Sequence, residues 1–148
     1  MHQITTIWKG DMLFSSNNPG GEILIDAGVE NGGKGQGLRP KALMLSALAG
    51  CSGLDIASLI RKMKLEVDEF KIETFGELTE EHPQVYHIVR VEYHFSGTNL
   101  NEERLQRTVD LSVEKYCGVM QMFKQFAKIE IKVFFHKNKL FSILQNFF

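Results

Sequence analysis

The sequence predicts an α+β domain in which antiparallel strands pack against buried helices. Residues 85–95 alternate between apolar and polar side chains, which is typical of a sheet with one buried face. Residues 42–54 contain no Asp, Glu, Lys, Arg or His and are rich in helix formers, so a helix here must be covered on most sides. The elements follow in the order strand meander, helix, hairpin, helix and strand, and this order favours an α+β fold.

Length and charge exclude several classes of protein. The 148 residues fit one domain, 1–148, with an apolar extension at about 137–148. A formal net charge of −1 gives no positive field for phosphate backbones, so we expect no nucleic-acid partner. No apolar stretch approaches the roughly 20 residues of a membrane span, and the N-terminus lacks a secretory signal. We therefore expect a cytoplasmic protein that has no contact with membranes.

The first 37 residues are predicted to form strands and a loop. Short apolar runs between Ile4 and Ile25, interrupted by the turn residues Asn17–Gly21, indicate a meander of two or three strands. Five of the ten residues from Gly28 to Gly37 are glycine, so this segment has a high backbone entropy. We expect it to be a flexible loop.

A helix and a hairpin come next. Residues 38–63 begin with Arg39-Pro40, and proline is tolerated in a first helical turn. Residues 65–78 and 85–95 are predicted to pair as antiparallel strands, with a bulge near Asp68-Glu69 where the apolar phase changes. His87 shares the apolar phase of its strand, so we expect it in the core.

The last part of the chain is predicted to contain a helix, a strand and a docked tail. Asn99 or Asn101 can cap a helix that Cys117-Gly118 interrupts, and residues 127–136 alternate as a strand. Five of the eleven phenylalanines fall between residues 134 and 148. We expect this tail to pack, because exposure would create a large apolar patch.

Three familiar kinds of site are not supported. The glycine cluster at 32–37 lacks the Gly-Lys-Ser/Thr ending of a phosphate loop. No two histidines have the i, i+4 spacing of a helical zinc site, and neither cysteine belongs to a Cys-x-x-Cys pair, so we expect no metal. Gly50-Cys51-Ser52-Gly53 is not the Gly-x-Ser-x-Gly elbow of serine hydrolases.

The two cysteines are the strongest candidates for chemistry. Cys51 lies on the apolar helix beside Gly50 and Gly53, which permit close approach of another backbone or a substrate. Cys117 lies where one helix breaks, and amide groups of a following helix could lower its pKa. From the residues alone, each cysteine is either a small buried apolar side chain or one of a redox-active pair.

Two motifs resemble those of a known family. RPKALMLSALAGCSGLD at 39–55 resembles the first-cysteine helix of the OsmC/Ohr superfamily, and EKYCGV at 114–119 resembles the second-cysteine motif of its OsmC-like branch. The resemblance implies an OsmC-like fold in which two subunits intertwine and antiparallel sheets wrap around central helices. It also implies a homodimer with active sites at the subunit interface.

The same resemblance implies a thiol-dependent peroxidase that reduces organic hydroperoxides in oxidative-stress defence. Cys51 would be the peroxidatic thiol and Cys117 the resolving thiol, with an external dithiol as reductant and no metal, flavin or haem. Family peroxidases use an activating arginine and an acid, but no arginine precedes Arg39 here and no acid follows Pro40 directly. The remaining candidates are the cations Lys9, Arg39 and Lys41, the polar support Asp55, and the pocket walls Leu48, Leu54, Met120 and Phe123.

Two other functions stay open. A noncatalytic module of the same fold could bind an apolar small molecule in its dimer cleft, and a thiol redox sensor could act on a protein partner.

Overall fold

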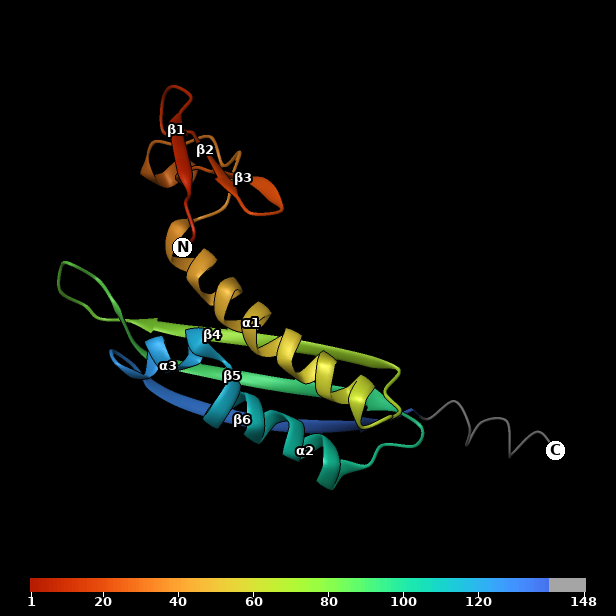
Figure 1. Cartoon of the computed structure of the whole chain (residues 1–148). Helices are drawn as coiled ribbons and strands as arrows, with labels where there is room; N and C mark the ends of the chain where they lie inside the picture. The colour runs from red at the N-terminus through yellow and green to blue at the C-terminus, as the bar shows by residue number, and fades with distance from the viewer. Residues whose placement is uncertain (139–148) are drawn as a thin grey trace, which may run out of the picture. The chain divides into compact units, whose positions relative to one another are not determined.

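The computed structural model describes residues 1–138, which divide into two compact units, Met1–Met44 and the residues from Leu45 onward (Figure 1). The α+β class predicted from the sequence is confirmed. The docking of the Phe-rich tail concerns mainly residues 139–148, which lie outside the described part of the chain. The prediction of a single domain stays a prediction.

The first unit contains the predicted meander. Strands β1 (Thr5–Trp8), β2 (Phe14–Asn18) and β3 (Gly21–Ile25) pair antiparallel in the order β1-β2-β3. Gly20 sits in the turn between β2 and β3 with φ of +92°, a conformation that favours glycine. The turn signal in the sequence therefore marks a real reversal of the chain.

The glycine-rich loop is organised around one carboxylate, and its flexibility stays a prediction. Asp26, only 2% exposed, accepts hydrogen bonds from the backbone N–H groups of Ala27, Lys34 and Gln36 at 2.8, 3.2 and 3.0 Å. These bonds, above all that from Gln36, hold the pKa of Asp26 below its usual value. A Cβ at Gly33 would collide with the Ala27 carbonyl, so the close approach requires glycine there.

The second unit is built on a mixed sheet. Strands β4 (Glu69–Leu78), β5 (Tyr86–Gly97) and β6 (Lys128–Lys137) lie in the order β4-β5-β6. β4 and β5 form the predicted antiparallel hairpin, but β6 pairs parallel to β5, so the expectation of purely antiparallel sheets is wrong for this strand. β6 runs parallel to β5 because the helical segment between them carries the chain back to the end of the sheet at which β5 begins.

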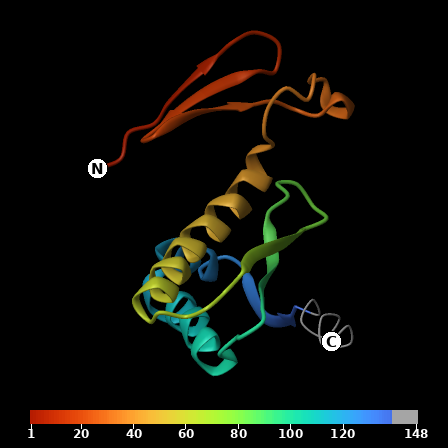
Figure 2. The same ribbon diagram turned by 90° about the vertical axis from the view of Figure 1, so that its right-hand side faces the viewer.

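Three helices cover one face of this sheet (Figure 2). They are α1 (Pro40–Lys62), α2 (Glu102–Leu111) and α3 (Gly118–Lys124), with a π-helical turn η2 (Ser112–Tyr116) between the last two. Asn101 caps α2, as the sequence predicts, by accepting from the N–H of Arg104. The fully buried side chains of the strand and helices form one core: Leu48, Ile56, Val89, Val91, Tyr93, Phe95, Leu105, Val109, Cys117 and Met120.

α1 presents two different faces in this chain. Leu48, Ser52 and Ile56 are buried, whereas the stripe Ala47, Gly50, Leu54 and Ala57 is exposed. By length and composition alone the helix could cross a membrane. Its buried face, with Leu48 and Ile56, packs in the core of the second unit.

The bulge in the hairpin lies at the opposite end from the one predicted. Pairing is regular from Glu69 to Glu77, and the register then shifts so that Glu77 faces Ile88 while Leu78 faces Tyr86. His87 is the extra residue, and its side chain is 43% exposed against Glu77. The expectation of a core histidine is wrong because the bulge turns Tyr86 inward instead.

Candidate active site

Cys51 occupies the border between the buried and exposed faces of α1. It is half-buried and packs against the core, one residue before the fully buried Ser52. Next to it, a Cβ built at Gly50 would meet nothing within 4 Å. The helix thus anchors Cys51 on one side and leaves room on the other.

Cys117 is positioned by the π-helical turn. Its backbone N–H donates to the carbonyl of Ser112, five residues earlier, at 2.9 Å, and the chain then leaves the helix with φ −76° and ψ 103°. The thiol caps the next helix, because its Sγ accepts from the N–H of Met120 at 3.3 Å. Cys117 has no exposed surface. π-Helical turns are frequent at functional sites.

The fold brings the two cysteines together. Burial raises the pKa of Cys117, the neighbouring Cys51 thiol raises it further, and the N–H of Met120 opposes these effects. The negative charge of Asp55 also raises the pKa. The expectation that helix amides would lower this pKa is therefore wrong in its net direction, because desolvation of the thiolate is the largest effect.

A chain of hydroxyl groups lies beside the cysteines. Ser52 Oγ is 2.7 Å from Tyr93 Oη and 2.9 Å from Ser112 Oγ, and Ser112 Oγ donates to Asp55 Oδ2 at 3.0 Å. Each hydroxyl has one proton, and an ionised carboxylate only accepts. With Asp55 ionised, the bonds can run in one direction only: Tyr93 donates to Ser52, Ser52 to Ser112, and Ser112 to Asp55.

This chain ties α1 to β5 and to the π-helical turn. Burial is the main cause that raises the pKa of Tyr93 to about 12, so its phenol keeps its proton. Asp55 therefore has the supporting position that the sequence suggested, one turn after Cys51. Ser52, Ser112 and Tyr93 were missed, because no local pattern indicates that residues 41 and 60 positions apart share hydrogen bonds.

The other predicted site residues are distributed unevenly. Leu48 and Met120 are fully buried and Phe123 is 3% exposed, and all three belong to the same core as Cys117. Leu54 is 75% exposed and lies outside that core, so within one chain it is not a wall of the site.

The candidate cations belong to the first unit. Lys9 and Lys41 are exposed, and Arg39 donates from Nη1 to the Gly37 carbonyl at 2.6 Å. Arg39 and Lys41 line a largely apolar pocket of about 470 Å³ together with Met12, Phe14 and Ile25. Their role beside a cysteine stays a prediction.

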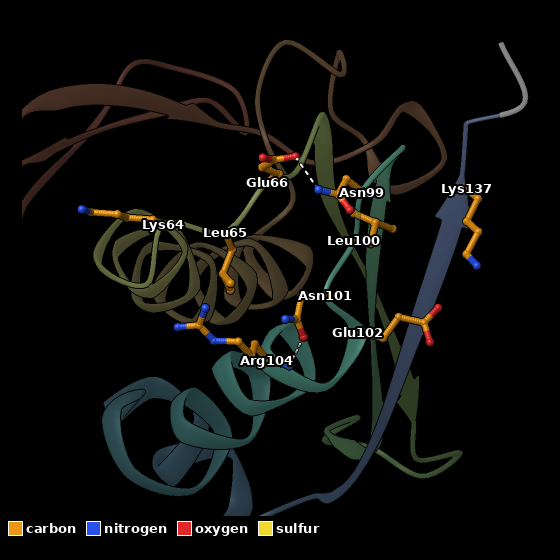
Figure 3. A pocket seen from close by; sticks show the side chains of 9 residues that line it. All are labelled: Lys64, Leu65, Glu66, Asn99, Leu100, Asn101, Glu102, Arg104 and Lys137. Atoms are coloured by element: carbon orange, nitrogen blue, oxygen red, sulfur yellow. Dashed lines mark hydrogen bonds between the residues drawn. The ribbon is translucent and has the colours of Figure 1, made fainter. Parts of the chain in front are cut away.

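A second pocket, of about 590 Å³, lies in the other unit and contains neither cysteine (Figure 3). It is polar, and Asn99 donates to Glu66 across it at 3.1 Å. Its lining comes from the segment that follows α1, the segment that leads into α2, the first turn of α2 and the end of β6: Lys64, Leu65, Glu66, Asn99, Leu100, Asn101, Glu102, Arg104 and Lys137. The predicted apolar substrate walls play no part in it.

Comparison with known proteins gives a consistent answer. The family model described as OsmC-like protein matches residues 33–132. Protein YhfA of Escherichia coli (strain K12) is 29% identical over 123 residues, which cover 82% of this chain and 89% of YhfA.

Two solved structures show the same fold. A hypothetical protein from Aquifex aeolicus VF5 aligns with a TM-score of 0.82 at 28% identity, over 93% of this chain and 98% of that one. The organic hydroperoxide resistance protein OhrB of Bacillus subtilis aligns with a TM-score of 0.64 at 16% identity, over 90% of this chain and 97% of that one.

Proposed function

The chain belongs to the OsmC-like proteins of the OsmC/Ohr superfamily, and on that premise we propose that it is a thiol-dependent peroxidase for organic hydroperoxides. The observation that carries the proposal is the pairing of Cys51 with Cys117, residues from two distant helical segments that share one site. Reduction of a peroxide by two thiols requires that one of them is ionised and that the two sulfurs can meet. The biological role would be defence against oxidative stress.

The surroundings of the two thiols support different roles for them, Cys51 as the peroxidatic thiol and Cys117 as the resolving thiol. Cys51 is partly accessible, whereas Cys117 is fully buried with a raised pKa, so Cys51 is the thiol that a peroxide meets first. The Cys51 thiolate attacks one peroxide oxygen, the O–O bond breaks, and the products are a Cys51 sulfenic acid and an alkoxide that takes up a proton to become the alcohol.

The second step uses the buried thiol. Cys117 sulfur attacks the sulfenic sulfur, a disulfide forms, and the hydroxyl leaves as water with the thiol proton. An external dithiol then reduces the disulfide. The hydroxyl chain from Tyr93 to Asp55 would hold α1 and the π-helical turn in register while the sulfurs exchange partners.

We also propose that the active unit is an intertwined homodimer. The stripe Ala47, Gly50, Leu54 and Ala57 leaves apolar and small side chains of α1 exposed along the helix that carries Cys51. A second copy that covers this stripe would place the site at the subunit interface. Leu54 would then become a substrate wall alongside Leu48, Met120 and Phe123, which favours lipid-like hydroperoxides.

The source of thiolate activation would be a lysine or arginine. Lys9, Arg39 and Lys41 are exposed cations of the first unit, and one of them beside Cys51 would stabilise its charged form. Without such a partner, a thiol near pKa 8.5 is only a few per cent ionised at neutral pH. We therefore expect slower turnover than in relatives that have the arginine and the acid.

The test is a single-turnover reaction with cumene hydroperoxide followed by intact-mass analysis. Wild type should lose two hydrogens and form a Cys51–Cys117 disulfide. Cys117→Ser should stop at a sulfenic acid that dimedone traps on Cys51, and Cys51→Ser should do neither. If Cys51→Ser still consumed the hydroperoxide at the wild-type rate, the assignment of Cys51 would be wrong.

A binding module is the second candidate, and the largely apolar pocket of the first unit favours it. Met12, Phe14 and Ile25 would contact an apolar ligand there, with the cysteines as packed side chains. A chain that forms the disulfide once but shows no turnover with a dithiol would favour this reading or a thiol redox sensor.

A further inference from the structure

The face of the β4–β6 sheet that faces away from the helices carries a compact group of titratable side chains. Glu92 and His94 alternate along β5 with the buried Val91, Tyr93 and Phe95, so they lie on the opposite face. The sequence predicts a solvated His94. Its side chain is instead only 13% exposed, because it stacks on Phe134 with ring centroids 4.8 Å apart.

Two carboxylates point an oxygen each at His94. Glu73 and Glu92 are direct partners across β4 and β5, so two like charges lie side by side, and Lys71 and Arg90 offset part of their repulsion. His94 Nε2 is 3.4 Å from Glu92 Oε1 and 4.0 Å from Glu73 Oε2, and the three atoms lie within 4.8 Å of one another.

The outer oxygens of both carboxylates are already held. Lys71 Nζ contacts Glu73 Oε1 at 3.1 Å, and Arg90 Nε donates to Glu92 Oε2 at 2.8 Å. These contacts restrict both glutamates, so the inner oxygens stay turned toward His94. Three donor atoms from two strands are therefore placed before anything binds.

His136 lies beside His94 and can select which ring nitrogen of His94 carries the proton. His94 Nδ1 is 2.9 Å from His136 Nε2, and the two rings stack with centroids 5.2 Å apart. When His94 donates its Nδ1–H to His136 Nε2, the lone pair on Nε2 of His94 faces the carboxylate oxygens. A histidine that binds a metal through one nitrogen usually donates from the other in this way.

We propose that Glu73, Glu92 and His94 bind a divalent transition-metal ion of the Zn²⁺ class, with His136 orienting His94. Bonds of about 2.0–2.2 Å in a tetrahedron separate neighbouring donors by about 3.3–3.6 Å. The 3.4 Å between His94 and Glu92 already has this spacing, whereas the Glu73 oxygen, 4.0 Å from His94, would move closer on binding. One imidazole and two carboxylates suit such an ion better than Ca²⁺, which takes six to eight oxygen ligands. Water would complete the coordination.

This site is separate from the proposed redox chemistry. The cysteines belong to the core on the helical face of the sheet, whereas these donors lie on the other face. Metal binding can therefore fail without any consequence for the peroxidase proposal, and the reverse also holds.

The test is calorimetric titration of the full chain with Zn²⁺ in the Cys51→Ser/Cys117→Ser background, because thiolates also bind zinc. We expect one ion per chain, loss of binding in His94→Gln, and at least about tenfold weaker binding in Glu73→Gln and His136→Gln. Glu73 is 45% exposed, so its substitution leaves the fold intact. The matched control is His87→Gln, which removes the other histidine of β5 that contacts a glutamate and should bind normally.

Three results would overturn the proposal. The background protein could fail to bind Zn²⁺, binding could survive both His94→Gln and Glu73→Gln, or His87→Gln could weaken it equally. In ¹⁵N spectra at pH 7.5, Zn²⁺ should shift Nε2 of His94. A ring that is doubly protonated and insensitive to Zn²⁺ would show that a proton, not a metal, sits between the carboxylates.

Discussion

Ser112→Ala should destabilise the protein far more than the loss of one hydroxyl normally does. Ser112 is fully buried, donates to Asp55 and accepts from Ser52. Removing the donor forfeits a charge-assisted hydrogen bond, worth about 1.5 kcal/mol for a half-buried carboxylate. Removing the acceptor leaves the buried Ser52 hydroxyl without a partner for its proton, which costs about 1–2 kcal/mol more.

The expected total is about 3 kcal/mol, which lowers the melting temperature by about 6–12 °C for a chain of this size. Tyr93→Phe should cost only about 1 kcal/mol from the hydrogen bond, because Tyr93 stands at the donor end of the chain and its removal strands no proton. Ser46→Ala, at an exposed position of α1, is the control and should change stability by less than about 0.5 kcal/mol.

The assay is urea unfolding at one fixed protein concentration, because any dimer makes stability depend on concentration. The direction of the hydrogen bonds requires that Ser112→Ala lowers the free energy of unfolding more than Tyr93→Phe does. If Tyr93→Phe cost as much as Ser112→Ala or more, the one-directional chain from Tyr93 to Asp55 would be wrong.

Three further predictions concern pH, accessibility and assembly. Asp26→Asn should destabilise the protein at neutral pH and lose its effect in acid: the folded pKa of Asp26 is lowered, so its stabilisation is present above the unfolded value of 3.8 and disappears as pH falls through the folded value. Iodoacetamide at pH 8 should alkylate Cys51 well before Cys117, as peptide mass mapping would show, and equal rates would contradict the burial and raised pKa of Cys117. Leu54→Glu should shift the sedimenting species toward monomer or reduce soluble yield, and an unchanged dimer would exclude Leu54 from the interface.

Much of the fold could be predicted because it depends on local periodicity. The alternation around Val91 and Tyr93 identified the buried face of β5, and Asn101 marked the start of α2. The parallel pairing of β6 could not be obtained in this way, because a strand has the same alternation whichever direction its neighbour runs. His87 was misplaced for a similar reason, since one extra residue in the hairpin reverses the phase beyond it.

The candidate site depends even more on contacts between residues far apart in the sequence, which local patterns cannot predict. The two cysteines were identified through motifs, but their polar support was not, because Ser52 and Ser112 meet only after α1 packs against the π-helical turn. Glu92-x-His94 could have been noticed, since the i, i+2 spacing in a strand puts both side chains on one face. Glu73 joins them only through the register of β4.

The most direct test of the proposed function is the rate at which Cys51 is oxidised in rapid-mixing experiments under excess hydroperoxide. The account predicts that cumene hydroperoxide oxidises the reduced wild type faster than it oxidises free cysteine, and faster than hydrogen peroxide does, because apolar walls surround the thiol. Oxidation of wild type no faster than that of free cysteine, with no preference for the organic peroxide, would contradict the peroxidase assignment.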